Sequence, residues 1–239
     1  MIFPAIDLRA GQSVRLYQGD FKQATLINPD PVVQAQQINA AGLQQLHMDD
    51  LDGAKSGRPE NFATITAIRQ AFTGTIELGG GIRTYELATR YLELGIDRLI
   101  LGSVALTDPR LVKRLLSEFG GERIVIGLDG TNGYVAIKGW LEQSQTKMST
   151  LMKTMTTSGA KHFIVTDVAR DGTMQGPNLA LYQELQAQVP TANLIASGGV
   201  RNLTDVQVLQ ASGFKDVIIG KALAEGGVTL AELAGVTEC

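Results

Sequence analysis

Two aspartates, Asp7 and Asp129, follow short apolar segments that lie far apart in the sequence. A pair of carboxylates is suited to general acid–base chemistry, in which one group donates a proton while the other removes one. That division of labour requires surroundings that keep one carboxyl group protonated and the other ionised. An isolated Asp more commonly caps a helix or pairs with a cation, but the matching positions of these two residues favour a catalytic role.

Two glycine motifs each occur twice, and their copies are offset by 118 residues. Gly80-Gly81 corresponds to Gly198-Gly199, and Gly102-Ser103 corresponds to Gly220-Lys221. Glycines let backbone N–H groups approach an anion closely, and the start of a following helix adds positive potential. One such pair could equally be a tight turn or a helix cap, but the repetition predicts two phosphate-binding sites. A substrate with two phosphates could thus bind to an acidic protein that has no basic patch.

Other polar and aromatic residues lie at or after the ends of similar short apolar segments. Thr166 ends an apolar segment and can donate a hydrogen bond, and Asp171 lies in the loop beyond it. Trp140, the only Trp, could either stack on a planar heterocycle or cover the edge of the core. Arg15 lies in an alternating stretch, Ser13–Leu16, which predicts a small hairpin over the site with the guanidinium available to an anion.

A cluster of acidic residues beside a histidine could suggest a metal site. Asp49, Asp50 and Asp52 follow His47, and both residue types bind divalent ions. On a strand, however, His47 and Asp49 share a face that Asp50 does not, and the sequence has no HxH or HExxH spacing. We therefore expect no metal. His47 is either a polar residue that lines the site or a hydrogen-bonded core histidine.

A regular alternation of short apolar segments and helical patterns positions these residues. The segments are too short for independent helices, and several are rich in β-branched residues, so we interpret them as strands. The eight expected strands are Ile2–Asp7, Gln45–Asp49, Thr75–Leu78, Arg98–Leu101, Ile124–Asp129, His162–Thr166, Leu194–Ala196 and Val217–Ile219. Strands that alternate with helices form parallel βαβ units, and eight such units in 239 residues predict an α/β protein with a closed (β/α)8 TIM barrel.

Local signals predict where several helices and turns lie. Asp30-Pro31 and Asp108-Pro109 are typical of an N-cap followed by Pro at the first helical position. Asn202 begins a similar helix start, and Asn132-Gly133 predicts a tight turn. The glycines expected to end helices are Gly42, Gly95, Gly159 and Gly213.

The offset copies indicate an internal repeat. Asp7 corresponds to Asp129, and Gly53 corresponds to Gly172. A single domain over residues 1–239, made of half-barrels at about 1–120 and 121–239, explains these matches. In such barrels the catalytic groups sit at the carboxyl ends of strands, and the loops after strands seven and eight often bind phosphate. The two aspartates would then lie on opposite sides of the barrel mouth.

Composition excludes several classes of protein. The chain has 21 Lys and Arg against 24 Asp and Glu, a formal charge of −3, and 44% hydrophobic residues. These values are typical of a soluble globular protein and argue against a nucleic-acid surface. The one Cys, Cys239, excludes a disulfide framework and a Cys-based zinc site. Since the apolar runs are too short for a signal or membrane segment, we expect a cytoplasmic enzyme that works as a monomer, without a membrane or nucleic-acid partner.

Several motifs together resemble the ProFAR isomerase family, the phosphoribosylformimino-aminoimidazole carboxamide ribotide isomerases of histidine biosynthesis. The resemblance covers the whole chain in order, and its motifs are Phe3-Pro4-Ala5-Ile6-Asp7-Leu8, Val14-Arg15-Leu16-Tyr17-Gln18-Gly19-Asp20, Asp50-Leu51-Asp52-Gly53-Ala54, Gly79-Gly80-Gly81-Ile82-Arg83, Gly139-Trp140, Thr166-Asp167, Arg170-Asp171-Gly172-Thr173 and Ser197-Gly198-Gly199-Val200.

The resemblance implies an Amadori rearrangement, from an aminoaldose to an aminoketose, on a bisphosphorylated substrate and without a cofactor. Such an enzyme is an intramolecular oxidoreductase. By the family's pattern, Asp7 is the base that removes the proton from C2 of the opened ribose. Asp129 is the usual candidate for the acid that opens the furanose, and Asp171 is its rival. Thr166 would hydrogen-bond near the ribose, and Trp140 would stack on the aminoimidazole. Further expected substrate contacts are Arg15, His47 and Arg83.

The resemblance also defines departures and alternatives. Asp49 stands where the family usually has an apolar residue, and this carboxylate could either alter nearby pKa values or be merely solvated. The sister cyclase of the pathway usually carries a Cys where this chain has Ile6, and the tryptophan-pathway isomerase uses a strand-one Cys as its base. Two alternatives to the simple isomerase stay open: a bifunctional enzyme that also acts on phosphoribosylanthranilate, and a catalytically silent phosphate-binding barrel.

Overall fold

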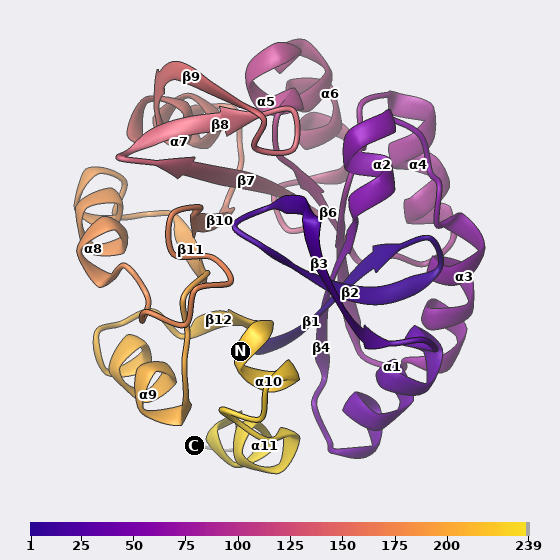
Figure 1. The fold of residues 1–239 in the computed structure, drawn as a ribbon. Helices are drawn as coiled ribbons and strands as arrows, with labels where there is room; N and C mark the ends of the chain where they lie inside the picture. Colours follow the sequence, from indigo (N-terminus) through magenta and orange to yellow (C-terminus); the bar gives the residue numbers. More distant parts are fainter. Residues whose placement is uncertain (238–239) are drawn as a thin grey trace.

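The computed structural model describes residues 1–237, and within them eight parallel strands close into a barrel (Figure 1). Pairing of β12 with β1 and of β7 with β10 completes the ring. The expected (β/α)8 TIM barrel is confirmed, with each expected strand in place, whereas Cys239 lies outside the described residues. The barrel strands are β1 (Ile2–Arg9), β4 (Gln45–Asp50), β5 (Thr75–Gly79), β6 (Arg98–Leu101), β7 (Ile124–Thr131), β10 (His162–Asp167), β11 (Asn193–Ser197) and β12 (Asp216–Ile219).

Helices surround the barrel (Figure 1). They are α1 (Pro31–Ala40), α2 (Leu51–Ser56), α3 (Phe62–Ala71), α4 (Tyr85–Glu93), α5 (Val104–Thr107), α6 (Pro109–Phe119), α7 (Met148–Thr157), α8 (Leu179–Gln188), α9 (Leu203–Ala211), α10 (Lys221–Ala224) and α11 (Leu230–Thr237). The predicted starts are confirmed, because the side chains of Asp30, Asp108 and Asn202 each accept first-turn N–H groups. No helix in the described part of the chain is long and apolar enough to cross a membrane.

Four more strands form hairpins beyond the first and fifth barrel strands. The expected hairpin is present as β2 (Gln12–Tyr17) and β3 (Asp20–Asn28), and a second one, β8 (Tyr134–Ile137) with β9 (Glu142–Lys147), was not expected. The sequence Glu142–Lys147 is entirely polar, so it lacks the alternation by which a strand is recognised. The predicted turn at Asn132-Gly133 leads into this hairpin, and both residues have positive φ.

Two strands extend further than predicted because the hairpins pair with their ends. β1 continues to Arg9 and β7 to Thr131, two residues beyond Asp7 and Asp129 respectively. The reason is that the last residues of β1 pair antiparallel with β2, and those of β7 pair antiparallel with β8. The two aspartates therefore lie within hydrogen-bonded strands, which restrains their backbones more than a loop would.

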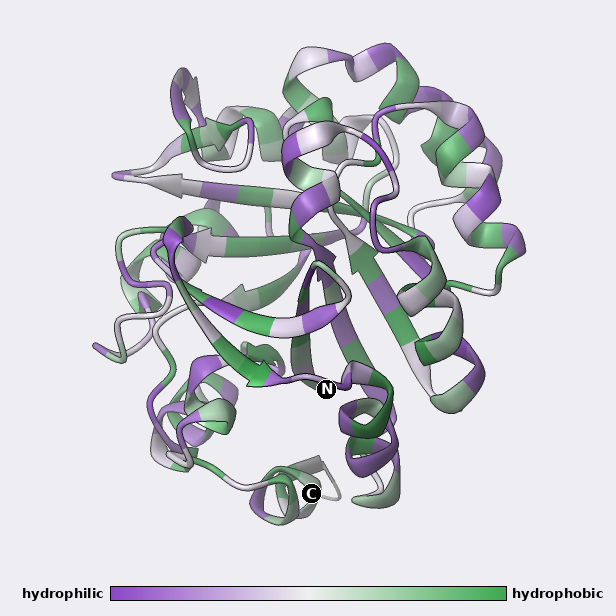
Figure 2. Cartoon of the chain, turned by 45° about the vertical axis from the view of Figure 1, so that its right-hand side comes forward, coloured by the Kyte–Doolittle hydropathy of each residue, from purple (hydrophilic) through white to green (hydrophobic). Residues whose placement is uncertain are grey.

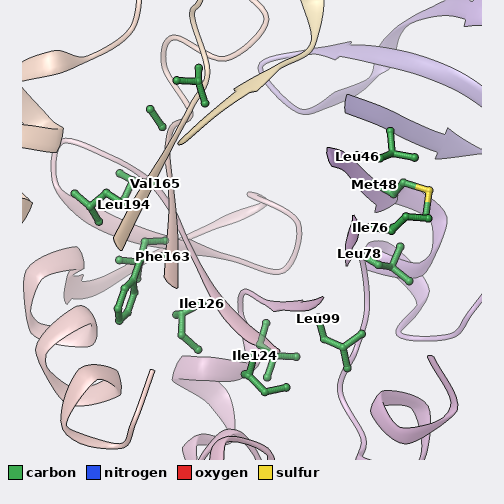
Figure 3. Packing of buried hydrophobic residues seen from close by; sticks show 14 of the residues in the cluster. Leu46, Met48, Ile76, Leu78, Leu99, Ile124, Ile126, Phe163, Val165 and Leu194 are labelled. Atoms are coloured by element: carbon green, nitrogen blue, oxygen red, sulfur yellow. The ribbon is translucent and has the colours of Figure 1, made fainter. Parts of the chain in front are cut away.

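Two layers of apolar side chains build the core. Outward-facing strand residues such as Leu46, Leu78 and Phe163 are fully buried beneath the helices (Figure 3). Each such side chain contributes about 1.5–3 kcal/mol by its burial. Hydrophobic and hydrophilic residues are interspersed along the surrounding helices (Figure 2). This is expected where one side of a helix packs on the barrel and the other faces solvent. Inside the barrel a second cluster consists of Phe3, Ala5, Val125, Ile164, Ile195 and Ile218.

Side chains alternate between the two faces of each strand, and this alternation decides which residues lie on the same face as the inner cluster and reach the pocket. Side chains two residues apart lie on the same face of a strand. In β1, Phe3 and Ala5 belong to the inner cluster and Asp7 lines the pocket above it. In β7, Val125 belongs to the inner cluster and Asp129 lines the pocket. An apolar floor thus supports the aspartates from below.

Candidate active site

A large pocket lies at the carboxyl ends of the barrel strands, and every residue predicted to act on or bind substrate lines it. The glycine motifs of both halves meet in this one pocket, as the repeat and the barrel together predict. The predicted residues found there are Asp7, Arg15, His47, Gly80, Gly81, Arg83, Gly102, Ser103, Asp129, Trp140, Thr166, Asp171, Gly198, Gly199, Gly220 and Lys221.

Asp7 is held by Arg15 from the neighbouring strand β2. Nη1 of Arg15 donates to Oδ2 of Asp7, and Nη2 donates to the carbonyl oxygen of Ala5 at 2.6 Å. Only 15% of the Asp7 side chain and 14% of the Arg15 side chain are exposed. Burial raises the pKa of Asp7, while the positive charge of Arg15 opposes this effect. The site therefore contains an oriented carboxylate with a cation beside it.

Asp129 is surrounded by hydrogen-bond donors. Thr166 is its register partner on β10, and the donor side chains of Thr166 and Trp140 both act on the carboxyl group. Burial raises the pKa of Asp129, and the two hydrogen bonds act in the opposite direction because they stabilise the ionised form. Trp140 thus has a polar contact in the site in addition to its ring surface.

Asp171 lies in the loop that follows β10. Its backbone N–H donates to the carbonyl oxygen of Asp167 at 3.0 Å, which anchors the loop to the strand end. Burial and the nearby charge of Asp7 raise the pKa of Asp171 to about 6, against the opposing effect of Arg15. Asp171 therefore keeps its proton to a higher pH than an ordinary Asp, whose pKa is near 3.8.

His47 lies between two carboxylates. Nδ1 is 2.8 Å from Oε1 of Glu77 on β5, and Nε2 is 3.2 Å from Oδ2 of Asp49. Burial alone would lower the pKa of His47, but hydrogen bonds and charges from Asp49 and Glu77 outweigh it and raise the pKa to about 10. His47 is therefore an imidazolium at neutral pH. It is both hydrogen-bonded in the core and part of the pocket wall.

The predicted shared face of His47 and Asp49 is confirmed by their hydrogen bond. Asp50 instead caps α2, since its Oδ1 accepts the N–H of Gly53 at 2.8 Å. Among residues 1–237, no group of three or more His, Cys, Asp or Glu side chains is arranged to hold a metal ion.

The glycine loops require glycine for two reasons at once. Gly81 and Gly199 have φ values of +77° and +81°, which other residues rarely adopt. A Cβ on Gly81 would lie 2.1 Å from the carbonyl oxygen of Gly53, and one on Gly199 would lie 2.5 Å from that of Gly176. Backbone therefore approaches backbone closely at both positions, which leaves the loops as tight edges of the pocket.

Two short helices begin at the other glycine motif of each half. Ser103 precedes α5 and Gly220 precedes α10, and neither provides a side-chain cap for the first-turn N–H groups. Nζ of Lys221 donates to the carbonyl oxygen of Gly172 at 2.7 Å, and Nη2 of Arg83 donates to that of Ala54 at 2.5 Å. Both cations thus stand at the pocket wall and donate to backbone carbonyls, and Lys221 also lies 3.5 Å from Oε1 of Glu225.

Sequence reasoning missed Glu77, Phe21 and Met174. Glu77 is fully buried beside His47, and the available signal was a lone charged residue within an apolar strand. Phe21 of β3 and Met174 of the loop after β10 line the pocket. Neither belongs to a motif whose spacing indicates chemistry, so only the folded chain reveals their position.

A closed (β/α)8 barrel with a polar pocket at the carboxyl ends of its strands defines the class of barrel enzymes. Within this class, the model of a family described as "Histidine biosynthesis protein" matches residues 1–229. The chain belongs to that family.

Relatives match the chain over nearly its full length. A protein of Leuconostoc mesenteroides is 53% identical over 236 residues, which are 99% of each chain. One from Lacticaseibacillus casei is 50% identical over 97% of each chain, and one from Cyanothece is 47% identical over 97% of this chain and 90% of its own. Each is named as an isomerase of an imidazole-4-carboxamide that carries two phosphoribosyl groups.

Proposed function

We propose that this chain is the isomerase that converts the aminoaldose ProFAR to the aminoketose PRFAR in histidine biosynthesis. The observation that carries the proposal is the pair of buried carboxyl groups, Asp7 and Asp171, between two sets of glycine loops in one pocket. The names of the relatives support the same reaction. An Amadori rearrangement needs one acid, one base and a means of holding two phosphates, and this pocket offers all three.

Substrate binding would use the two-fold repetition of the glycine loops. One phosphate binds at Gly80-Gly81 and Gly102-Ser103, and the other binds at Gly198-Gly199 and Gly220-Lys221. The supporting observations are the close backbone packing of these loops and the lack of side-chain caps on α5 and α10. Arg83 adds a positive charge on the first side and Lys221 adds one on the second. The reacting ribose then lies across the middle of the pocket, over the carboxylates.

The first chemical step is opening of the furanose. A carboxylic acid donates its proton to the ring oxygen, the bond between C1 and that oxygen breaks, and the exocyclic nitrogen forms an iminium with C1. We assign this acid to Asp171 rather than to Asp129. Asp171 is close enough to Asp7 to feel its charge, and its pKa of about 6 keeps it protonated to a higher pH than an ordinary Asp. Burial raises the pKa of Asp129 as well, but the donor side chains of Trp140 and Thr166 oppose that rise because they stabilise the ionised form.

The second step is proton removal from C2 by Asp7. The electron pair of the C2–H bond forms the C1–C2 double bond and neutralises the iminium. The resulting enol then becomes the ketone at C2 as C1 gains a proton and the C2 hydroxyl group loses one, so the product is an isomer of the substrate and no oxidant is consumed. Arg15 supports this role because it orients Asp7 and stabilises its ionised form.

Trp140, Thr166 and His47 would complete the substrate contacts. Trp140 offers an indole ring at the pocket wall for the aminoimidazole, and Thr166 offers a hydroxyl group near the ribose. Since the lining residues that carry the proposal all come from one chain, we also propose that a monomer is sufficient for activity, which gel filtration of the active enzyme tests.

The deciding experiment is turnover of ProFAR by the purified protein, with a chelator present and the cyclase of the pathway as coupling enzyme. Phosphoribosylanthranilate is assayed in parallel. Turnover of ProFAR alone is the expected result. Turnover of both substrates would establish a bifunctional isomerase. Tight binding of ProFAR without turnover would overturn the proposal in favour of a silent phosphate-binding barrel.

A further inference from the structure

We propose that Glu77 is a positioning residue of this active site: it holds His47 as an oriented cation, and His47 in turn favours the ionised form of the base Asp7. Glu77 does not touch the pocket, so it acts through His47 alone. The effect of His47 on the base Asp7 rests on the proposed function. The protonation of His47 by contact with Glu77 does not.

The register of the barrel brings these side chains to one level. His47 on β4 pairs with Ala5 on β1 and with Glu77 on β5, and Glu77 pairs with Arg98 on β6. In parallel strands, register partners project to the same face. His47 lines the pocket from inside the barrel, so Glu77 also faces the interior. Two residue pairs further along, and on the same face, Asp7 is the register partner of Asp49. The row of His47 and Glu77 thus lies directly beneath the catalytic level.

Burial makes the contact between Glu77 and His47 strong. The Glu77 side chain is 0% exposed and that of His47 is 8% exposed, with 2.8 Å between Oε1 and Nδ1. The second oxygen of Glu77, Oε2, has no hydrogen-bond partner among the described residues. A buried carboxylate without a countercharge is unfavourable, so protonated His47 stabilises Glu77 here, beside the register neighbour Arg98 on β6. Because Nδ1–H is directed at Glu77, the Nε2–H group is directed at Asp49 on the pocket wall.

Asp49 also contacts His47, but from a different environment. Its side chain is 39% exposed, and its carboxylate is 3.2 Å from Nε2. Electrostatic attraction is weaker where water screens it than in the barrel interior. Gly79 leaves the space that Asp49 occupies, since a Cβ there would lie 2.2 Å from Oδ1 of Asp49. Glu77 therefore provides the stronger hold on His47, and Asp49 provides a second one at the solvent side.

The positive charge of His47 acts on the carboxyl groups of the active site. Asp7 from β1 and Asp129 from β7 both experience its positive charge, which opposes the rise in the pKa of each carboxyl group that burial and the charge of Asp49 cause. Arg15 from β2 stands on the other side of Asp7. Asp7 thus has two cations to stabilise its ionised form, and the second depends on Glu77. Arg98 is the remaining charged neighbour, placed beside Glu77 on β6 by register.

The direct test is a nitrogen-15 NMR titration of the imidazole rings. The chain has two histidines, so His162→Gln assigns the signal of His47. In the wild-type protein His47 is expected to stay protonated well above the ordinary histidine midpoint of about 6.5. Glu77→Gln should lower its midpoint by at least about one pH unit, while Glu93→Gln, on the exposed face of α4, should leave it unchanged.

Two results would overturn the inference. One is a wild-type His47 that titrates near about pH 6.5, which needs no variant and so holds even if Glu77→Gln fails to fold. The other is an identical His47 midpoint in the wild type and in Glu77→Gln.

The link to catalysis has its own readout. His47→Gln, which removes the positive charge at every pH, should move the acidic limb of the kcat/KM profile to higher pH by about one unit, about a tenfold loss on that limb. A purely structural role would lower activity equally at all pH values, and that result would contradict the link to Asp7. If the wild type does not turn over ProFAR, the proposed function fails, while the NMR titration still decides whether Glu77 holds His47.

Discussion

Gly19, in the turn between β2 and β3, lies directly against the indole ring of Trp140. A Cβ on Gly19 would lie 2.5 Å from Cε3 of that ring. The two residues come from the hairpins that follow β1 and β7, so the hairpins of the two barrel halves meet beside the pocket. Trp140 has a φ of +68°, and Lys138 and Gly139 before it are also in the left-handed region. The contact with Gly19 holds this strained segment in place.

Gly19→Ala is expected to displace Trp140 and weaken substrate binding. Loss of one aromatic stacking contact corresponds to about a 3–10-fold rise in KM. Because Trp140 is the only Trp, the intrinsic fluorescence reports its displacement directly. Gly133→Ala is the matched control, since Gly133 has a similar φ of +79° but no atom within 4 Å of the place that the new methyl group would take. Equal effects of both substitutions would show that backbone strain, and not the Trp140 contact, matters.

Asp7→Asn is expected to abolish turnover while substrate still binds. The amide keeps the shape of the side chain but cannot accept the C2 proton, so kcat should fall by about 10²–10⁴-fold. Isothermal titration calorimetry with ProFAR should show an affinity within a few-fold of the wild type. Near-normal turnover would show that another group is the base.

The pH dependence of kcat/KM distinguishes the two candidate acids. If Asp171 is the acid, activity should decline as the pH rises through its pKa of about 6 in the free enzyme, because the proton needed by the ring oxygen is lost. Asp171→Asn should remove this limb and most of the activity. Asp129→Asn should lower activity but keep the limb. The reverse pattern would assign the acid to Asp129.

Gly81→Ala tests the phosphate-binding loops. A left-handed alanine costs about 1–2 kcal/mol, and here the new methyl group would also collide with the carbonyl of Gly53. We expect KM to rise at least about tenfold, with a parallel loss of affinity for inorganic phosphate. Gly42→Ala is the control, because its φ is +85° but its surroundings are open and it lies outside the pocket. That variant should lose stability only.

The stability of the protein should depend on pH through His47. Its pKa is raised from 6.5 to about 10 on folding, so the folded state binds the proton more tightly and gains stability that is fully present below pH 6.5. This contribution is lost as the pH rises toward 10. Urea unfolding at a series of pH values should therefore show a gap between the wild type and His47→Gln that narrows from about pH 6 to about pH 10. A constant gap would contradict the shifted pKa.

Most of the barrel could be predicted from the sequence because its signals are local or periodic. Asp30 and Asp108 mark helix starts through contacts within one turn, and the eight apolar segments appear as strands through composition alone. The second hairpin escaped prediction because β9 is polar on both faces. The expected ends of β1 and β7 fell short by two residues because their last pairings are with hairpin strands rather than with barrel neighbours.

The sequence by itself determined that the two aspartates and the glycine motifs gather at one pocket. The repeat of Asp7 in Asp129 and of the glycine motifs places each at a strand end, and a parallel barrel brings all strand ends to one side. Only the tertiary structure decided how these groups interact. The contact of His47 with Glu77, the hydrogen bond from Trp140 to Asp129 and the influence of Asp7 on Asp171 all join segments distant in the chain. Their protonation depends on burial and on a few ångströms of separation, and neither quantity can be read from residue spacing.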